Sequence, residues 1–263
     1  MPSREQPTAF EESIRILRSN LDVALADIRQ PSVVVTSANP NEGKTVISSN
    51  LAISLAAARQ RVVLVDMDLR HPNLHRLLGA QNQFGVAEVL LGQRPLEDAL
   101  QYIELPPQVA GREGPGLYFL GTGAQVSNPT ELLDSGRTAR LLQRLAEQAD
   151  VVLLDTPPVL PVADTLVLGR MAAGAIIVTE ARRTAITAVQ KAKELLIRNQ
   201  TRLLGVVVNK FQPRDADYGY GYGYGYGDRR PPSDDIIVEH EGGHIHSNGA
   251  DSDPAVEGTD HPL

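Results

Sequence analysis

The segment that most constrains the fold is a short loop joining an apolar run to a helical pattern. The segment Val33–Val35 is typical of a buried strand, and residues 46–58 are typical of a helix. Gly43-Lys44-Thr45 lie between the two. Backbone amides at a helix start bind phosphate oxygens, the Lys44 ammonium would neutralise β- and γ-phosphates, and the Thr45 hydroxyl would ligate Mg²⁺. An isolated Gly-Lys-Thr would be an ordinary turn, but this context predicts a phosphate-binding loop.

The loop departs from the usual G-x-x-x-x-G-K-[ST] pattern. Ala38 stands where the first glycine is expected, and we expect Asn41 to adopt a left-handed conformation that glycine adopts more easily. The residues predicted to line the nucleotide are Asn39, Pro40, Asn41, Glu42, Gly43, Lys44, Thr45 and Val46.

Three acidic residues follow two further apolar runs: Asp66 and Asp68 after the first, and Asp155 after the second. Ligands of open α/β sheets bind at the carboxyl ends of strands, so these acids should converge near Lys44. Each of these acids, taken alone, would also suit a turn at the end of a strand. Together they predict Mg²⁺ held by Thr45 and carboxylates, directly or through water.

Phosphoryl transfer to a protein hydroxyl also needs a carboxylate that accepts the proton, and Asp66 or Asp68 could do so. No His-Arg-Asp or Asp-Phe-Gly segment is present, which excludes a kinase of the eukaryotic protein-kinase type. At the end of the last apolar run, Asn209 either reads the adenine edge with its amide or simply ends a strand.

The pattern along the chain predicts an α/β fold with a doubly wound, mostly parallel sheet. Apolar residues from Phe10 to Ile28 recur at helical spacing, so we expect an amphipathic helix ended by Pro31. Beyond it, continuously apolar strands imply a sheet covered on both faces. The strands are expected at residues 33–35, 62–65, 151–154, 175–178 and 203–208.

The periodicity stops after Phe211, where a Tyr-Gly repeat begins a tail. The repeat is either a sticky low-complexity segment, a strand or a functional tyrosine cluster, and its glycines disfavour the strand. Composition predicts a disordered end. The expected organisation is a helical arm at 1–31, a nucleotide-binding domain at 32–211, a tyrosine cluster at 212–227 and an acidic disordered tail at 228–263.

Charge and composition exclude several other classes. The chain has 25 basic and 32 acidic residues, which argues against non-specific binding to nucleic acid. It has no cysteine, so disulfides and thiolate zinc sites are excluded. No apolar run suits a membrane span or a secretory signal, so we expect a cytoplasmic location.

Three motifs resemble those of the bacterial tyrosine kinases (BY-kinases) of capsule and exopolysaccharide systems: Ser37–Thr45, Val65–Arg70, and Leu154–Pro158 with Pro161–Asp164. The resemblance spans roughly residues 8–227. It implies a P-loop NTPase fold like that of the partition ATPases, with ATP and Mg²⁺ as cofactors and protein tyrosine as acceptor.

By motif, the resemblance assigns a role to each polar residue of the site. Lys44 and Thr45 would bind phosphates and Mg²⁺, and Asp68 and Asp155 would serve the metal. Asp66 would activate the tyrosine hydroxyl, so that Lys44, Asp66 and Asp68 form the catalytic set. The autophosphorylation sites would be the tail tyrosines Tyr218, Tyr220, Tyr222, Tyr224 and Tyr226.

The resemblance also implies an assembly and partners. Glu12, Arg15 and Arg18 match a Glu-x-x-Arg-x-x-Arg motif that closes these kinases into rings, with an octamer as the candidate size. On a helix these charges should face away from the core. As a stand-alone form, the chain would be activated by a membrane chain-length determinant (a polysaccharide co-polymerase). That partner would hold it at the inner membrane, and a cognate tyrosine phosphatase would remove the phosphate groups.

Two rival functions stay open. A partition or positioning ATPase shares the fold, but that class needs a lysine early in the loop, and Ser37–Pro40 contains none. A non-catalytic nucleotide-binding scaffold would have its tail modified by another enzyme. Incubation of the protein with ATP alone separates this scaffold from a kinase.

Overall fold

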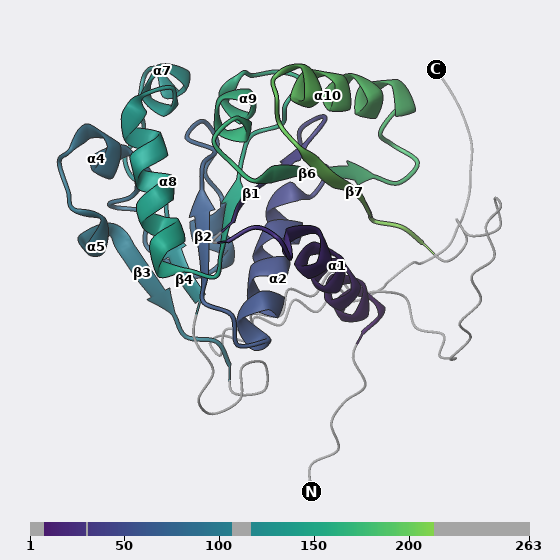
Figure 1. Ribbon diagram of the computed structural model, residues 1–263, viewed down its shortest axis with the longest axis horizontal. Coiled ribbons are helices and arrows are strands. Elements are labelled where there is room, and N and C mark those ends of the chain that lie inside the picture. Colours follow the sequence, from purple (N-terminus) through teal and green to yellow (C-terminus); the bar gives the residue numbers. More distant parts are fainter. Residues whose placement is uncertain (1–7, 30, 107–116, 213–263) are drawn as a thin grey trace, which may run out of the picture. The chain divides into compact units, whose positions relative to one another are not determined.

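A computed structural model describes residues 8–29, 31–106 and 117–212. Their centre is a seven-stranded sheet in the order β3-β4-β2-β5-β1-β6-β7, parallel except for the β3–β4 pair (Figure 1). The predicted α/β class and mostly parallel sheet are confirmed. The strands are β1 Ser32–Ser37, β2 Val62–Asp66, β3 Leu100–Ile103, β4 Leu117–Leu120, β5 Val151–Asp155, β6 Gly174–Glu180 and β7 Leu203–Asn209.

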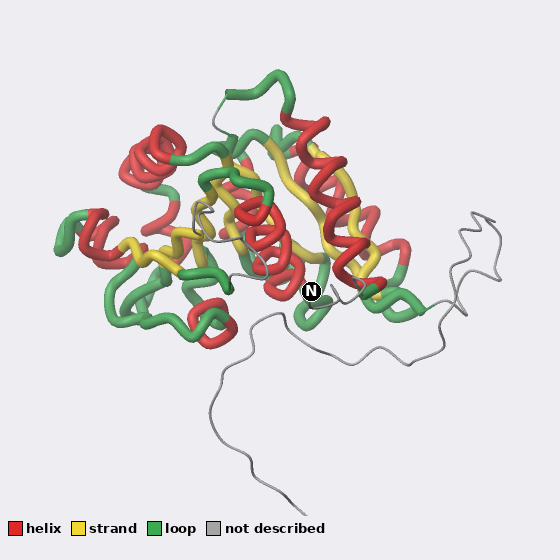
Figure 2. The backbone as a smooth tube through the Cα atoms, turned by 90° about the horizontal axis from the view of Figure 1, so that it is seen from below, coloured by secondary structure: helices red, strands yellow, loops and turns green. Residues whose placement is uncertain are grey.

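Helices cover both faces of the sheet, as Figure 2 shows. Val34 packs in one core cluster and Val35 in another, because successive side chains of a strand point to opposite faces. The Val35 face is covered by α1 Ala9–Leu25 and α2 Lys44–Ala57, and α3 Leu74–Leu77 contacts α2. The Val34 face is covered by α4 Val86–Leu91, α5 Leu96–Ala99, α7 Pro129–Leu133, α8 Gly136–Gln148, α9 Asp164–Gly169 and α10 Ile186–Arg198.

The N-terminal helix begins with a capping box. The Glu11 amide donates to Thr8 Oγ1 at 3.2 Å, and the Thr8 amide donates to Glu11 Oε2 at 2.6 Å. The helix ends at Leu25, before Ile28, the last residue of the predicted helical pattern, and before Pro31, which was predicted to end it. The chain turns there because it must reach β1, and because Pro31 disfavours a helical residue before it.

Two strands of the sheet, β3 and β4, were not predicted from the sequence. β3 and β4 have only four residues each, and they pair antiparallel at one edge of the sheet. Their two tyrosines, Tyr102 and Tyr118, lie opposite each other with ring centroids 5.4 Å apart. Such short runs, one interrupted by Gln101, carry too little periodicity to predict a strand.

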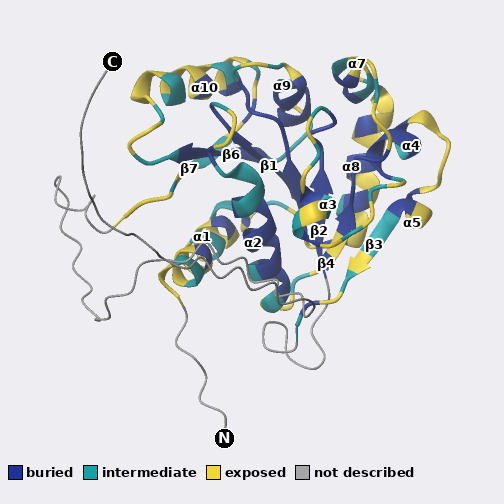
Figure 3. Ribbon diagram, turned by 180° about the vertical axis from the view of Figure 1, so that it is seen from behind, coloured by how far each residue is buried: buried dark blue, intermediate teal, exposed yellow. Residues whose placement is uncertain are grey.

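The inner strands are buried along their length, whereas β7 alternates towards solvent (Figure 3). Their register is level at the carboxyl ends: Asp66 pairs with Asp155, and Asp155 pairs with Val35. The chain segments that follow β1, β2 and β5 therefore meet at the side of the sheet where the strands have their carboxyl ends, called the sheet edge below.

Candidate nucleotide site

The predicted phosphate-binding loop runs from the end of β1 to the first turn of α2, so residues 39–46 all lie at the sheet edge just described. Asn41 has φ 65°, which confirms its expected left-handed conformation. Gly43 has φ 91°, and a Cβ there would lie 2.0 Å from Asn209 Nδ2. Both the backbone and the available space therefore require glycine at this position.

The Glu42 side chain braces the loop from inside. It is 4% exposed and accepts hydrogen bonds from the Asn39 amide at 2.9 Å, Asn39 Nδ2 at 3.0 Å and the Thr184 hydroxyl at 2.6 Å. Its carboxylate is thus committed to the protein, which leaves only its backbone amide for a nucleotide. Thr184 was not identified from the sequence, where a threonine after β6 carries no distinguishing pattern.

Asn209 is also a brace of the loop. Its Nδ2 donates to the Glu42 carbonyl at 3.1 Å, and its Oδ1 accepts from the Lys210 amide at 2.8 Å. The end of β7 is therefore attached to the phosphate-binding loop. Reading of the adenine edge by Asn209 stays a prediction, and it would require this amide to change partners.

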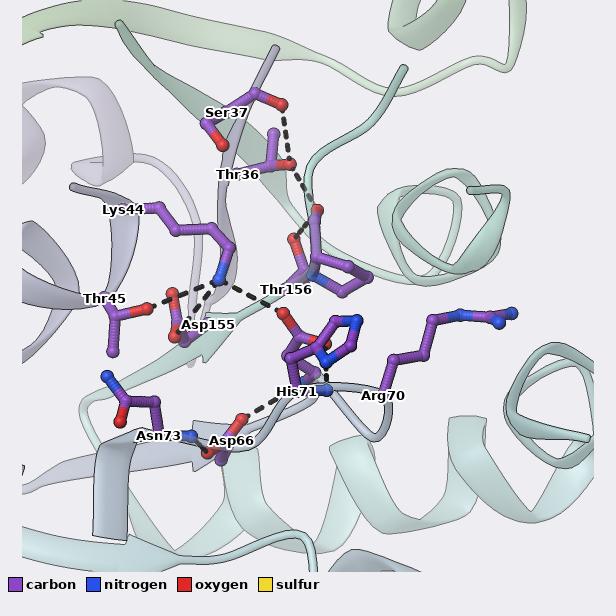
Figure 4. Close-up of polar contacts among 12 residues, drawn as sticks. Thr36, Ser37, Lys44, Thr45, Asp66, Arg70, His71, Asn73, Asp155 and Thr156 are labelled. Atoms are coloured by element: carbon purple, nitrogen blue, oxygen red, sulfur yellow. Dashed lines mark hydrogen bonds and ion pairs between the residues drawn. The ribbon is translucent and has the colours of Figure 1, made fainter. Parts of the chain in front are cut away.

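Lys44 lies among the predicted acids (Figure 4). Its Nζ is 3.2 Å from Asp68 Oδ2, 3.3 Å from Thr45 Oγ1 and 3.9 Å from Asp155 Oδ2. Burial would lower the pKa of Lys44, but Asp155 and Asp68 outweigh this effect and raise it. The predicted convergence of Lys44, Thr45, Asp68 and Asp155 is therefore present, with a charged ammonium at its centre.

Asp66 plays a different part from Asp68. Its carboxylate accepts three backbone hydrogen bonds, from the amides of Asp68, Asn73 and Leu74, each at 3.2 Å. Burial and the neighbouring Asp155 raise the pKa of Asp66 to about 8. The side chain thus shapes the turn after β2, and its role as proton acceptor stays a prediction.

Asp155 has a carboxylate oxygen that suits a cation. The residue is 1% exposed, and its Oδ1 has no hydrogen-bond partner among the residues described. Burial raises the pKa of Asp155 to about 6, against the opposing charge of Lys44. Buried polar atoms normally have partners, and carboxylate and hydroxyl oxygens are the ligands that Mg²⁺ prefers.

The residues present fit Mg²⁺ only with help from other ligands. Within the described ranges, no three His, Asp or Glu side chains are grouped so as to hold a metal by themselves. Magnesium usually keeps several waters and binds through one or two carboxylates and substrate phosphates. Thr45, Asp68 and Asp155 would supply the protein's share.

An ion pair between the partly exposed Arg70 and the buried Asp164 supports the turn that carries Asp68. Arg70 Nε lies 2.7 Å from Asp164 Oδ2, and Arg70 Nη2 lies 3.1 Å from Asp164 Oδ1 and 3.0 Å from Thr130 Oγ1. The Thr130 hydroxyl donates to the same carboxylate. Arg70 and Asp164 both belong to the motifs quoted above, whereas nothing in the sequence pointed to Thr130.

In the N-terminal arm, the structure corrects one expectation. Arg15 is exposed and pairs with Glu12 at 3.4 Å, as expected for an outward face. Arg18 instead turns towards α2, where its Nη1 donates to the Ser54 carbonyl at 3.0 Å. Its long side chain reaches across the flank of the helix, so facing away from the core is wrong for this residue. The five tail tyrosines lie outside the described residues.

The fold and loop define a P-loop nucleotide-binding domain. The family model described as CobQ/CobB/MinD/ParA nucleotide binding domain matches residues 33–218. Among solved structures, the kinase domain of Escherichia coli tyrosine kinase ETK is 30% identical, with a TM-score of 0.72. That match covers 82% of this chain and 80% of the ETK chain.

Similar proteins with assigned names narrow the class of P-loop protein to which the chain belongs. Tyrosine-protein kinase YwqD of Bacillus subtilis is 37% identical over 216 residues, which are 82% of this chain and 87% of YwqD. EpsB of Ralstonia nicotianae is 37% identical over 209 residues, but this chain spans only 26% of the length of EpsB. The chain belongs to the bacterial tyrosine-protein kinases, within the CobQ/CobB/MinD/ParA nucleotide-binding family. Across the part of the chain that is described, no helix is long and apolar enough to cross a membrane.

Proposed function

We propose that the chain transfers the γ-phosphoryl group of ATP to the five tail tyrosines, between neighbouring subunits. The observation that carries this proposal is the position of Lys44 between the carboxylates of Asp68 and Asp155, together with the other Asp155 oxygen, Oδ1, which has no partner among the described residues. A cation surrounded by carboxylates at a phosphate-binding loop suits a site that receives both phosphates and a metal ion.

In this reaction the chain's own residues position and neutralise charge. Loop amides and Lys44 hold the β- and γ-phosphates, and Lys44 exchanges its carboxylate contacts for phosphate oxygens. The phosphoryl group passes from ATP to the tyrosine oxygen, ADP leaves, and the hydroxyl proton goes to Asp66 or Asp68. A bound Mg²⁺ would neutralise the charge that develops on the phosphates.

The place where the chain leaves the sheet supports the choice of acceptor. β7 ends beside the phosphate-binding loop, where Lys210 Nζ lies 3.4 Å from the Asn41 carbonyl. Only Phe211–Asp217 separate this point from Tyr218. The random-coil span of a seven-residue segment is about 15 Å, enough to reach a subunit held close by.

The wider setting belongs to the same proposal. Glu12, Arg15 and Arg18 would contribute to a ring-shaped homo-oligomer, with the octamer as the candidate size. A membrane chain-length determinant would activate the kinase and keep it at the inner membrane, and a tyrosine phosphatase would reverse the reaction. Through this cycle the chain would regulate capsule or exopolysaccharide polymerisation or export. No nucleic acid takes part.

Mass spectrometry of the full chain after incubation with Mg-ATP tests the activity, with and without a fragment of the activating partner. We expect phosphate on Tyr218–Tyr226, and none in a Lys44→Met variant alone. ATP hydrolysis without phosphotyrosine would favour the partition-type ATPase. Nucleotide binding with neither reaction would favour the scaffold.

Mixing two variants tests transfer between subunits. Lys44→Met chains keep acceptor tyrosines, and chains with all five tail tyrosines replaced by Phe keep the kinase site. We expect the Lys44→Met chains to be phosphorylated in the mixture. If they stay unmodified although both proteins co-assemble, transfer between subunits is wrong.

A further inference from the structure

A small pocket opens beside the turn that carries Asp68. Leu69, Arg70 and Pro72 form one wall, residues 122–125 form the other, and the volume is about 210 Å³. Asp68 directly precedes Leu69, and its Oδ1 accepts the His71 amide at 3.0 Å. One turn therefore holds the carboxylate next to Lys44 and also builds the pocket wall.

The first wall is held in place by the Arg70–Asp164 ion pair described above. The second is held by two side chains from outside it. Asn82 Oδ1 accepts the Gly123 amide at 3.1 Å, and Glu88 Oε1 accepts the Ala124 amide at 3.0 Å. Glu88 is only 6% exposed. Both walls are therefore preformed, and the second wall lies outside the phosphate-binding loop and the acids around Lys44.

The pocket has the size of one aromatic ring. Pockets for small molecules usually measure about 300–1,000 Å³, so a nucleotide does not fit. A cavity of about 150 Å³ is enough for benzene. Leu69 and Pro72 offer apolar contact, and Arg70, whose side chain is 34% exposed, adds a planar guanidinium of the kind that stacks on aromatic rings.

We propose that this pocket binds the ring of the acceptor tyrosine, an inference that rests on the proposed kinase function and names its acceptor subsite. The ring would lie between Arg70 and residues 122–125, with its hydroxyl directed along the turn towards Asp68. The glycines of the Tyr-Gly repeat suit such a site, because a residue without a Cβ lets the backbone approach a narrow pocket closely.

The length of the tail agrees with this occupant. β7 lies four strand positions from β2 in the sheet, which is about 19 Å at the usual strand spacing. Lys210–Asp217 can extend over about 26 Å, so the repeat is long enough to reach the pocket of its own subunit as well as that of a close neighbour. The mixing experiment above separates these two routes.

A substitution that fills the pocket tests the inference. Ala124 lines the pocket and is exposed, so Ala124→Phe should occupy the ring position without disturbing the core. Ser127→Phe is the matched control, because Ser127 is also exposed on this loop but does not line the pocket. Both are made in full chains whose five tail tyrosines are replaced by Ala, with a separate peptide of residues 217–227 as the acceptor.

We expect Ala124→Phe to lower kcat/KM for the peptide about tenfold or more, the loss expected when one ring is kept out of its pocket, and Ser127→Phe to leave it unchanged. Affinity for ADP, measured by calorimetry, should be the same in both. A normal rate with Ala124→Phe would overturn the pocket assignment and leave the kinase function standing.

A binding measurement keeps the inference testable if no variant transfers phosphate. The peptide is titrated into the ADP-bound protein while backbone amide signals are followed by NMR. Shifts at residues 122–125 that vanish in Ala124→Phe would support the site even if the proposed activity fails. Saturable binding that leaves these amides unshifted would overturn it.

Discussion

Arg70 and Asp164, from two different loops of the sheet edge, form a two-point ion pair in which Asp164 is fully buried. Arg70 follows β2 and Asp164 begins α9, so the pair links the turn that carries Asp68 to the helix after β5. Planar, two-point pairing fixes orientation as well as distance. The position of Asp68 against Lys44 therefore depends on a contact outside the nucleotide site.

Replacement of Asp164 by Asn should lower the free energy of unfolding by about 1–3 kcal/mol, because a buried hydrogen bond to a charged group is weakened. Urea denaturation measures this loss. The exposed Arg61–Asp150 pair provides the control, and Asp150→Asn should cost less than about 1 kcal/mol. Equal losses in the two variants would contradict a special role for the buried pair.

Replacement of Asp155 by Asn should weaken Mg-ADP binding at least about tenfold, because a neutral amide cannot balance the metal charge. Binding of ADP in excess EDTA should change much less, which calorimetry can show. Asp134→Asn, at an exposed position that follows α7, serves as the control. Unchanged Mg-ADP affinity would remove Asp155 from the site.

The nucleotide-free protein should lose stability as the pH rises from about 4 to 8. Burial and Asp155 raise the pKa of Asp66 from 3.8 to about 8, so the folded state binds more protons than the unfolded state within this window. Thermal midpoints measured across the window should fall with pH, and Asp66→Asn should make the decline shallower. The exposed Asp98→Asn should leave it unaltered. A decline as steep in Asp66→Asn as in the parent would refute this assignment.

The two arginines of the arm should behave differently on replacement by Ala. Arg15→Ala should reduce the mass of the assembly in light scattering without changing ADP affinity, because its side chain is exposed. Arg18→Ala should in addition lower the free energy of unfolding by about 1 kcal/mol, because it loses the bond to the Ser54 carbonyl on α2. Lys193→Ala controls for the loss of one exposed cation. Identical oligomers in all four proteins would exclude Arg15 from the interface.

The sequence by itself determined the features that depend on neighbouring residues. A buried strand, a loop ending in Gly-Lys-Thr and a helix predicted the phosphate-binding loop, including the left-handed Asn41. Apolar runs ending in Asp66 and Asp155 predicted two strands and the edge at which they meet. These features are local because backbone conformation follows from hydrophobic period and turn chemistry within a few residues.

Only the tertiary structure decided which side chains share a contact. The strand order places Asp66 beside Asp155, yet hydrogen bonds to backbone amides commit Asp66 to its turn, while Asp68 reaches Lys44. Arg18 meets α2, and Thr130 joins Arg70 and Asp164, although no spacing in the sequence indicates either contact. Such contacts join segments far apart along the chain, so they depend on strand register and helix packing, which are properties of the whole sheet.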